Sequence, residues 1–403
     1  MLMRSGACGI MQAFAFSASR PPCMTPPSPT LPAPGGAQDV PDAAPSQTPL
    51  KTLADLERRL ELLGAKAGHK RLVYRAWLGL APWPDQEAFS SGRRPLPPKR
   101  VLERLPQIRQ ALEAAARIRS RHPGGDPESE RLLVTLGDGQ TVESVLLPRR
   151  GVCVSTQMGC AVGCVFCMTG RGGLVRQLTD LEIVAQAATA RRLRPATKKV
   201  VFMGMGEPSH NLRNVLSAVR FLAQYGAFGH KDLVISTVGD PRLFDELNAS
   251  DVRPALALSL HTVDDEKRSR LLPRGCRMKV ADLVAAAEAW GRTSGYPVQY
   301  EWTLMKDVND GLDEIDALGR LLAGHYAMVN FIPVNAVEGS PYRRPEREHA
   351  AELVRRLRSA GVVATLRDSA AQDVDGGCGQ LRARVLKEFR GAGEANEAGE
   401  MLP

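Results

Sequence analysis

Three cysteines, Cys160, Cys164 and Cys167, stand close together in the sequence with the spacing Cys-x3-Cys-x2-Cys. Thiolates are the usual protein ligands of iron–sulfur clusters, so three of them on one tight loop can bind three irons of a [4Fe-4S] cluster and leave the fourth iron open. A zinc site with Cys153 as a fourth thiolate is the alternative. Structural zinc sites usually carry two cysteine pairs that lie farther apart, which favours the cluster.

The same spacing is typical of radical S-adenosylmethionine (SAM) enzymes. In enzymes that resemble the chain at this motif, the open iron binds the amino and carboxylate groups of SAM. An electron from the cluster then breaks a carbon–sulfur bond of SAM and forms a 5′-deoxyadenosyl radical. The motif therefore predicts two cofactors, a [4Fe-4S] cluster and SAM.

The composition is typical of an intracellular enzyme, because the 403 residues contain only 8 cysteines and half of these gather in one region. No stretch approaches the roughly 18 consecutive apolar residues of a membrane span, so we expect a soluble, cytoplasmic protein. The formal net charge of +9 is compatible with a polyanionic partner such as nucleic acid. Charge alone is weak support, and aromatic residues, at 5%, are too few for a dedicated single-strand stacking platform.

Composition and periodicity divide the chain into five segments. The first is rich in Pro, Ser and Ala without a period, which predicts disorder; a transit peptide, or a start codon placed too early with Met24 as one candidate, are the alternatives. Apolar residues at helical spacing follow, and the pattern of apolar residues then changes to one typical of strands. The predicted segments are an N-terminal extension (1–50), a small helical domain (51–121), an entry hairpin (122–150), a catalytic domain (151–390) and a disordered tail (391–403).

Strands alternate with amphipathic, helix-length segments through the catalytic domain, which predicts an α/β fold with a parallel sheet and right-handed crossovers. About six such units are present, fewer than the eight of a closed barrel. We therefore expect an incomplete (β/α)6-type barrel with a small helical domain before it. The predicted strands are 199–203, 233–237, 255–260, 298–304, 328–333 and 362–367, preceded by a hairpin of 131–136 and 141–147.

Polar residues follow several of these strands. Ligands of parallel α/β sheets bind at the carboxyl ends of the strands, so these residues are candidates for a binding site. After the first strand, Gly206 would let the backbone approach a ligand and Glu207 could bind an ammonium group. The alternatives are a tight turn at the glycines and helix caps elsewhere. The later strand ends carry Ser236, Ser259, Leu260, His261 and Asn335.

Further motifs carry a resemblance to a known family. They are Cys153-Val154-Ser155-Thr156-Gln157, Gly204-Met205-Gly206-Glu207-Pro208, Ser259-Leu260-His261, Val308-Asn309-Asp310-Gly311, Ile332-Pro333 with Asn335, and Asp373-Val374-Asp375-Gly376-Gly377-Cys378-Gly379-Gln380-Leu381. Over roughly residues 130–390 the chain resembles the radical SAM adenine methyltransferases of RNA. This family comprises bacterial dual-specificity enzymes that methylate C2 of an adenine in 23S rRNA and some tRNAs, and resistance enzymes that methylate C8.

The resemblance implies a role for each candidate residue. The cluster ligands would be Cys160, Cys164 and Cys167, and the SAM contacts would be Gly206, Glu207, Ser236, Ser259, Leu260, His261 and Asn335. One SAM would methylate Cys378, and the radical from a second SAM would take a hydrogen from that methyl group. The carbon radical would add to the adenine, Glu143 would accept the ring proton, and Cys153 would release the RNA by forming a transient disulfide with Cys378.

The same resemblance implies RNA, from 23S rRNA and from tRNA, as the partner of the catalytic and helical domains. It also implies an external electron donor such as flavodoxin or ferredoxin, and we expect a monomer. Cys8, Cys23 and Cys276 match no family motif and are assigned no role.

The chain departs from the family where RNA would be touched. Residues 366–372 lack the basic stretch that the family carries before its methylated cysteine, and Val334 stands where the rRNA enzymes have Trp. A C8 methyltransferase of the resistance type and a paralogue acting on another RNA therefore stay open as alternatives. A radical SAM enzyme with a non-RNA substrate should not need both Cys153 and Cys378, and an inactive RNA-binding relative should have lost one of the essential cysteines.

Overall fold

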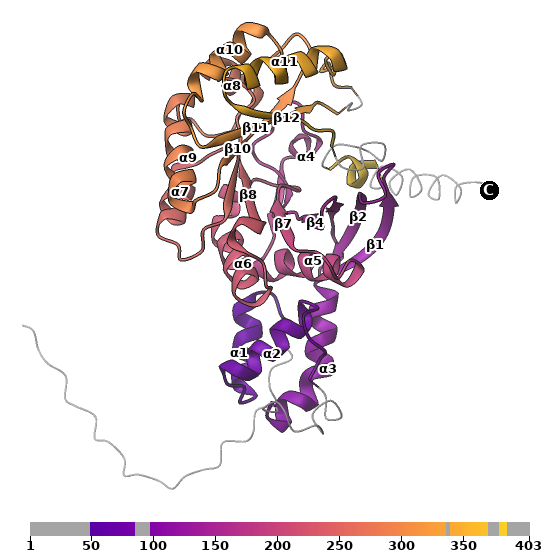
Figure 1. The fold of residues 1–403 in the computed structure, drawn as a ribbon. Helices are drawn as coiled ribbons and strands as arrows, with labels where there is room; N and C mark the ends of the chain where they lie inside the picture. The colour runs from indigo at the N-terminus through magenta and orange to yellow at the C-terminus, as the bar shows by residue number, and fades with distance from the viewer. Residues whose placement is uncertain (1–48, 85–96, 336–338, 370–378, 385–403) are drawn as a thin grey trace, which may run out of the picture. The chain divides into compact units, whose positions relative to one another are not determined.

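The structure, a computed structural model, describes residues 49–84, 97–335, 339–369 and 379–384 (Figure 1). Cys8, Cys23 and Cys378 lie outside the described residues, as do the predicted tail 391–403 and all but the last two residues of the predicted extension 1–50.

The described chain begins with three helices, α1 (Leu53–Leu62), α2 (Ala67–Trp77) and α3 (Lys99–Ala114). A capping box starts α1, in which the Thr52 hydroxyl accepts the Asp55 N–H and the Asp55 carboxylate accepts the Thr52 N–H. The apolar face of α2 packs on the catalytic part of the chain, since the Tyr74 ring lies 5.0 Å from the ring of Phe221 in α6 (Leu212–Tyr225). The helices predicted for the start of the domain are therefore present.

Strand β1 (Ala116–Pro123) occupies the last residues of the range for which the sequence predicts helix. Its side chains alternate between covered and exposed positions, with Arg117, Arg119 and Arg121 exposed. This period of two is that of a strand. A register shift between Ile118 and Ser120 interrupts its antiparallel pairing with the neighbouring strand.

Ten strands form one sheet, in the order β1-β2-β3-β4-β7-β8-β9-β10-β11-β12. The first three pairs are antiparallel and the pairs from β4 to β12 are parallel. The strand bounds are β2 Glu130–Leu136, β3 Thr141–Leu147, β4 Gly151–Cys153, β7 Lys199–Phe202, β8 Leu233–Thr237, β9 Ala255–Ser259, β10 Val298–Leu304, β11 Ala327–Pro333 and β12 Val363–Leu366. Every predicted strand is present within one or two residues of its expected ends, and β4 is an additional parallel strand.

Helices cover the outer side of the parallel strands (Figure 1). They are α5 (Asp180–Leu193), α6, α7 (Pro241–Asn248), α8 (Asp265–Leu271), α9 (Val280–Ser294), α10 (Leu312–Leu321) and α11 (Arg347–Ser359). The predicted fold class, an incomplete barrel of the radical SAM type preceded by helices, is confirmed.

Short elements complete the described chain. A separate two-stranded sheet of β5 (Gln157–Gly159) and β6 (Leu174–Gln177) brackets the cysteine motif, together with the single-turn helix α4 (Met168–Arg171). The 3-10 turns η1 (Pro208–Asn211) and η2 (His230–Asp232) lead into α6 and β8.

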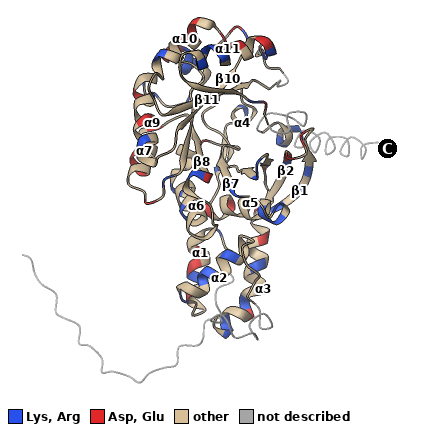
Figure 2. Cartoon of the chain, in the orientation of Figure 1, with Lys and Arg blue, Asp and Glu red and all other residues tan. Residues whose placement is uncertain are grey.

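Charged side chains are spread over the surface of the described chain. Figure 2 shows Lys and Arg among Asp and Glu on most helices. Among the described helices, none combines the length and the apolar composition that crossing a membrane requires.

Candidate active site

The cysteine motif lies on a loop between β5 and α4 whose path depends on glycines. Gly159 has a φ of +77°, and a Cβ at this position would lie 2.0 Å from the carbonyl oxygen of Gly173. Gly170 also packs closely, because a Cβ there would lie 2.8 Å from the Cα of Gly163. Only glycine permits these approaches, which fold the loop back on itself.

The three thiols of the loop are close enough to affect one another. Burial raises the pKa of Cys160 to about 12, and it raises the pKa of Cys164 well above the usual value, with the neighbouring cysteine charges adding to both shifts. Such thiols become ligands when a positively charged metal group offsets the burial and the repulsion. The donor set thus fits a [4Fe-4S] cluster.

A cluster and a single metal ion require different arrangements of their ligands. Within the described part of the chain, no three or more His, Cys, Asp or Glu side chains converge in the way that one metal ion would require. In a cluster each thiolate binds a separate iron, so convergence on one point is not needed.

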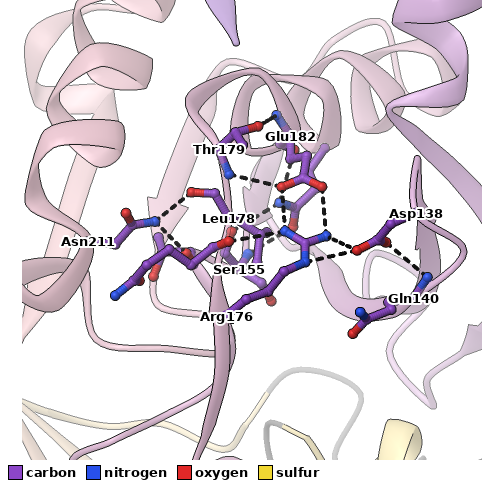
Figure 3. Close-up of polar contacts among 11 residues, drawn as sticks. Asp138, Gln140, Ser155, Arg176, Leu178, Thr179, Glu182 and Asn211 are labelled. Carbon is purple, nitrogen blue, oxygen red and sulfur yellow. Dashed lines mark hydrogen bonds and ion pairs between the residues drawn. The ribbon is translucent and has the colours of Figure 1, made fainter. Parts of the chain in front are cut away.

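A polar network on β6 holds the far end of the loop (Figure 3). The Arg176 guanidinium lies 2.7 Å from the Asp138 carboxylate of the β2–β3 turn and 2.8 Å from the Glu182 carboxylate of α5. The Asn211 side-chain amide donates to the carbonyl oxygens of Thr156 and Leu178, at 2.7 Å each, and so joins β5 to the end of β6. The loop therefore starts and ends on fixed strands.

The turn after β7 brings Glu207 beside the cysteine loop. Gly206 has a φ of +104°, and a Cβ there would lie 2.5 Å from the Gln157 side chain. The Glu207 carboxylate is buried and accepts hydrogen bonds from the Thr237 hydroxyl at 2.5 Å and the Val238 N–H at 3.0 Å. Its negative charge contributes to the raised pKa of Cys160, which places the carboxylate within electrostatic reach of the loop.

The ends of β8 and β9 carry the next candidates. Ser236 is buried near the end of β8, and Ser259 ends β9. Leu260 is buried and its N–H donates to the carbonyl oxygen of Glu301 in β10 at 3.0 Å. These residues lie at the carboxyl ends of adjacent parallel strands, as the sequence predicts.

His261 adopts a strained backbone conformation, with a φ of +65°. Its ring packs edge-on against Phe166 of the cysteine loop, with the ring centroids 4.9 Å apart. Burial lowers the pKa of His261 to about 3, and Nδ1 accepts the Thr303 N–H at 3.0 Å. The ring is therefore neutral with its proton on Nε2, which leaves a hydrogen-bond donor for a ligand.

Sequence reasoning gave no role to two buried residues that support these strand ends. The Asn309 side chain donates to the carbonyl oxygens of His261 at 2.7 Å and Thr303 at 2.8 Å. Arg268 is 3% exposed, and its Nη2 donates to the carbonyl oxygens of Val238 at 2.7 Å and Ser259 at 3.0 Å. Arg268 stands in the middle of α8, whose sequence DEKRSRL is mostly charged, so the sequence gives no sign that this residue faces inward.

A cavity of about 900 Å³ occupies the interior of the incomplete barrel. Cys153 and Glu143 line it from β4 and β3, and Glu301 lines it from β10. Asn335, after β11, also lines the cavity, and its side-chain amide donates to the Ser369 hydroxyl at 2.8 Å. The cavity thus brings Cys153, Glu143 and Asn335 to one space.

Glu143 connects the hairpin to the C-terminal part of the described chain. Its carboxylate is 1% exposed and lies 3.2 Å from the Arg131 guanidinium, which is equally enclosed. The same carboxylate accepts the N–H of Gly379 at 3.1 Å and of Arg382 at 2.8 Å, at the start of the helical turn 380–384. Glu143 therefore binds the segment that directly follows Cys378.

Gly379 also contacts the loop of the cysteine motif. A Cβ at Gly379 would lie 2.6 Å from the Thr169 hydroxyl, and Thr169 stands two residues after Cys167.

Cys153 lies on β4, the strand that pairs with the Glu143 strand β3. Burial raises the pKa of Cys153 to about 11, although the nearby positive charge of Arg131 opposes this shift. Cys153 is therefore a protonated thiol at neutral pH.

The chain matches the radical SAM superfamily over residues 154–320. A protein of Leptothrix cholodnii named "Probable RNA methyltransferase" is 55% identical over 335 residues, which cover 82% of this chain and 94% of that protein. A protein of the same name from an Azoarcus species is 55% identical and covered to 95%. The crystal structure of a radical SAM methyltransferase from Sphaerobacter thermophilus superposes with a TM-score of 0.69 at 35% identity, over 82% of this chain and 98% of that one.

These alignments run through nearly the whole of each relative and include the cysteine loop, the strand ends and the barrel described above. The chain therefore belongs to the radical SAM superfamily, in the family of enzymes to which these "Probable RNA methyltransferase" proteins belong.

Proposed function

We propose that this radical SAM enzyme methylates carbon C2 of an adenine base in RNA, with 23S rRNA as its main substrate and tRNA as a second one. The names of relatives that are 55% identical support RNA methylation as the reaction class. The family motifs of the sequence support adenine as the base.

The observation that carries the proposal is the position of Glu143. This carboxylate, proposed as the proton acceptor, accepts a hydrogen bond from Gly379, the residue that follows Cys378. It also lines one cavity together with Cys153, the proposed resolving thiol. A reaction that ends with proton removal and disulfide formation needs these groups within reach of one bound base.

Membership of the superfamily implies a [4Fe-4S] cluster and SAM. When bound, they supply the methyl group and the radical chemistry that activates it, and we propose that two SAM molecules are used in each turnover. We assign the cluster to Cys160, Cys164 and Cys167. The proposed SAM contacts are Gly206, Glu207, Ser236, Ser259, Leu260, His261 and Asn335.

The remaining steps belong to the side chains of the cavity. Arg131 pairs with Glu143 at 3.2 Å and holds its carboxylate at the cavity wall, where the carboxylate would accept a ring proton. The Cys153 thiol would lose its proton and attack the sulfur of Cys378, so that a disulfide forms and the bond from that sulfur to the methylene carbon on the base breaks. The released carbon would take the bonding electrons and a proton and so become the methyl group. An external donor such as flavodoxin or ferredoxin would return electrons, and we expect the enzyme to act as a monomer.

Mass spectrometry of digested rRNA and tRNA, from cells with and without the gene, tests this function. We expect 2-methyladenosine to disappear from the RNA of cells that lack the gene and to return when the purified enzyme is added. Loss of 8-methyladenosine instead would assign the enzyme to the resistance type. Unchanged methyladenosine in both RNAs would mean that the substrate is wrong.

A second experiment tests the roles of the two proposed catalytic cysteines. We expect Cys153→Ala to stop after the RNA has become attached to Cys378, so that a covalent protein–RNA adduct accumulates. Cys378→Ala should form no adduct, and Cys276→Ala is the matched control that should turn over normally. An adduct that forms equally in all three variants would contradict the assigned roles.

A further inference from the structure

A row of polar side chains crosses the interior of the barrel at one level. Glu301 of β10 pairs in register with Asn330 of β11, which pairs with Thr365 of β12. The Thr365 hydroxyl donates to the Asn330 side-chain oxygen Oδ1 at 2.9 Å, and the Asn330 side-chain amide donates to Glu301 Oε1 at 2.8 Å. The row therefore fixes the orientation of the Glu301 carboxyl group.

Glu301 shares the cavity wall with both apolar and charged side chains. Val201 and Val234 line the cavity from β7 and β8, and Lys199 and Arg367 line it within electrostatic reach of the carboxyl group. The Glu301 residue is only 6% exposed, and the Asn330 amide holds its Oε1. Burying a carboxyl group costs free energy, and a carboxyl group that is held by one oxygen at the wall of a cavity is suited to bind a ligand there.

The carboxyl group faces the space in which the proposed reaction occurs. Glu301 lines the same cavity of about 900 Å³ as Cys153 and Glu143. Burial raises the pKa of Glu301 to about 7, although Arg367 and Lys199 oppose the shift. A carboxyl group that keeps its proton near neutral pH can donate one hydrogen bond and accept others.

This pairing of donor and acceptor matches one edge of adenine. Adenine presents its N6 amino group as a donor beside a ring nitrogen that is an acceptor. Guanine presents two acceptors, O6 and N7, on the corresponding edge and cannot form both bonds. We propose that Glu301 binds an adenine ring inside the barrel by accepting from its N6 amino group and donating to the adjacent ring nitrogen.

Both the target base of the RNA and SAM contain adenine, and the cavity favours the target base. Among the described residues that line it, Cys153 and Glu143 have proposed roles toward the RNA. Of the proposed SAM contacts in the described chain, Asn335 lines the cavity, whereas Gly206, Glu207, Ser236 and His261 do not. The inference rests on the proposed function, and it adds the group that would select adenine.

Three substitutions separate this role from others. Glu301→Ala removes both hydrogen bonds and should lower kcat/KM for ribosomal RNA purified from cells lacking the gene by about 10- to 100-fold. Glu301→Gln keeps a donor and an acceptor, and glutamine pairs with adenine in this way, so it should retain activity within about fivefold of the wild type. Glu352→Gln, on the exposed face of α11, is the matched control.

Two further measurements identify the adenine. The dissociation constant for SAM, measured by calorimetry without RNA, should change less than about twofold in Glu301→Ala. Wild-type iron content and far-ultraviolet circular dichroism would show that the variant is folded. A weaker SAM affinity with an unchanged KM for RNA would overturn the assignment and point to the adenine of SAM.

Unchanged values for both SAM and RNA in a folded Glu301→Ala would overturn the proposal altogether. Loss of activity in Glu301→Gln equal to that in Glu301→Ala would also overturn it, because it would mean that the carboxyl group transfers a proton. A wild-type enzyme that methylates no adenine in this RNA would refute the proposed function itself. That outcome is distinct, since it does not depend on any variant.

Discussion

The side-chain amide of Asn309 donates a hydrogen bond of 2.7 Å to the carbonyl oxygen of His261, 48 positions earlier in the chain. His261 has a φ of +65°. This conformation is unfavourable for a histidine and persists only where the surrounding structure holds it. The Asn309 side chain also accepts the Met305 N–H at 2.8 Å, and the Trp302 indole donates to its backbone oxygen at 3.2 Å. Asn309 thus fixes the loop that presents the His261 ring.

Asn309→Ala should destabilise both this loop and the fold. It leaves buried backbone groups without partners, so we expect a loss of about 2–4 kcal/mol in the free energy of unfolding. Under native conditions SAM should bind about tenfold more weakly, because His261 would lose its fixed position. Denaturant unfolding and calorimetric titration with SAM measure the two effects.

Asn248→Ala provides the control for this prediction. Asn248 ends α7 on the surface, so its replacement should change stability by less than about 0.5 kcal/mol. A stable Asn309→Ala protein with normal SAM affinity would show that the loop holds its conformation without the amide.

Glu143 is expected to order the C-terminal segment in addition to its proposed role as a base. Its carboxylate accepts the N–H groups of Gly379 and Arg382, so Glu143→Ala should free the turn 380–384. Amide hydrogen exchange in a peptide covering this turn should become at least about tenfold faster, corresponding to the loss of about 1.4 kcal/mol. Glu130→Ala, which removes a carboxylate of the same hairpin that pairs with Arg121, should leave this exchange unchanged.

Slow exchange in Glu143→Ala would contradict the positioning role. Glu143→Gln separates the two roles, because an amide can still accept one of these hydrogen bonds but cannot take a proton. We therefore expect slower exchange in Glu143→Gln than in Glu143→Ala, together with lost methylation in both.

The long parallel strands could be predicted because their residues form buried apolar runs between turns. Strand β8, Leu233–Thr237, is buried at all five positions, and its predicted ends are those of the structure. Strands β4 and β5 span three residues each, too few for a period to appear. Strand β1 is rich in arginine and has few apolar residues, so the alternation of covered and exposed side chains is not visible in its sequence. The residues before it also have helical spacing.

The candidate site divides in the same way. The cysteine motif and the strand ends are contiguous in sequence, so Cys160 and Glu207 could be proposed from local patterns. The partners of His261 could not, because Asn309 reaches it from a distant segment. The position of Glu301 could not be predicted either. A glutamate within a strand ordinarily indicates a solvent-exposed face, but the curved sheet places this face of β10 on the wall of a cavity.

Removal of one thiol from the cysteine loop should abolish the cluster. Cys160→Ala leaves two of the three proposed ligands, so reconstituted protein should contain far less than the about four irons per chain of a [4Fe-4S] cluster. Cys276→Ala should retain the wild-type iron content, because Cys276 lies outside the loop. Equal iron loss in both variants would mean that the cluster ligands are wrongly assigned.

The raised pKa of Glu301 predicts how stability changes with pH. Burial raises this pKa from 4.5 to about 7, so between these values the folded protein holds a proton that the unfolded chain releases. The free energy of unfolding should therefore fall as pH rises through this range, by up to about 3 kcal/mol, and level off above it. The hydrogen bond from the uncharged Asn330 amide and the positive charges of Arg367 and Lys199 limit the rise of this pKa. In Glu301→Gln this pH dependence should be absent, and identical profiles for the two proteins would show that Glu301 is ionised in the folded state throughout the range.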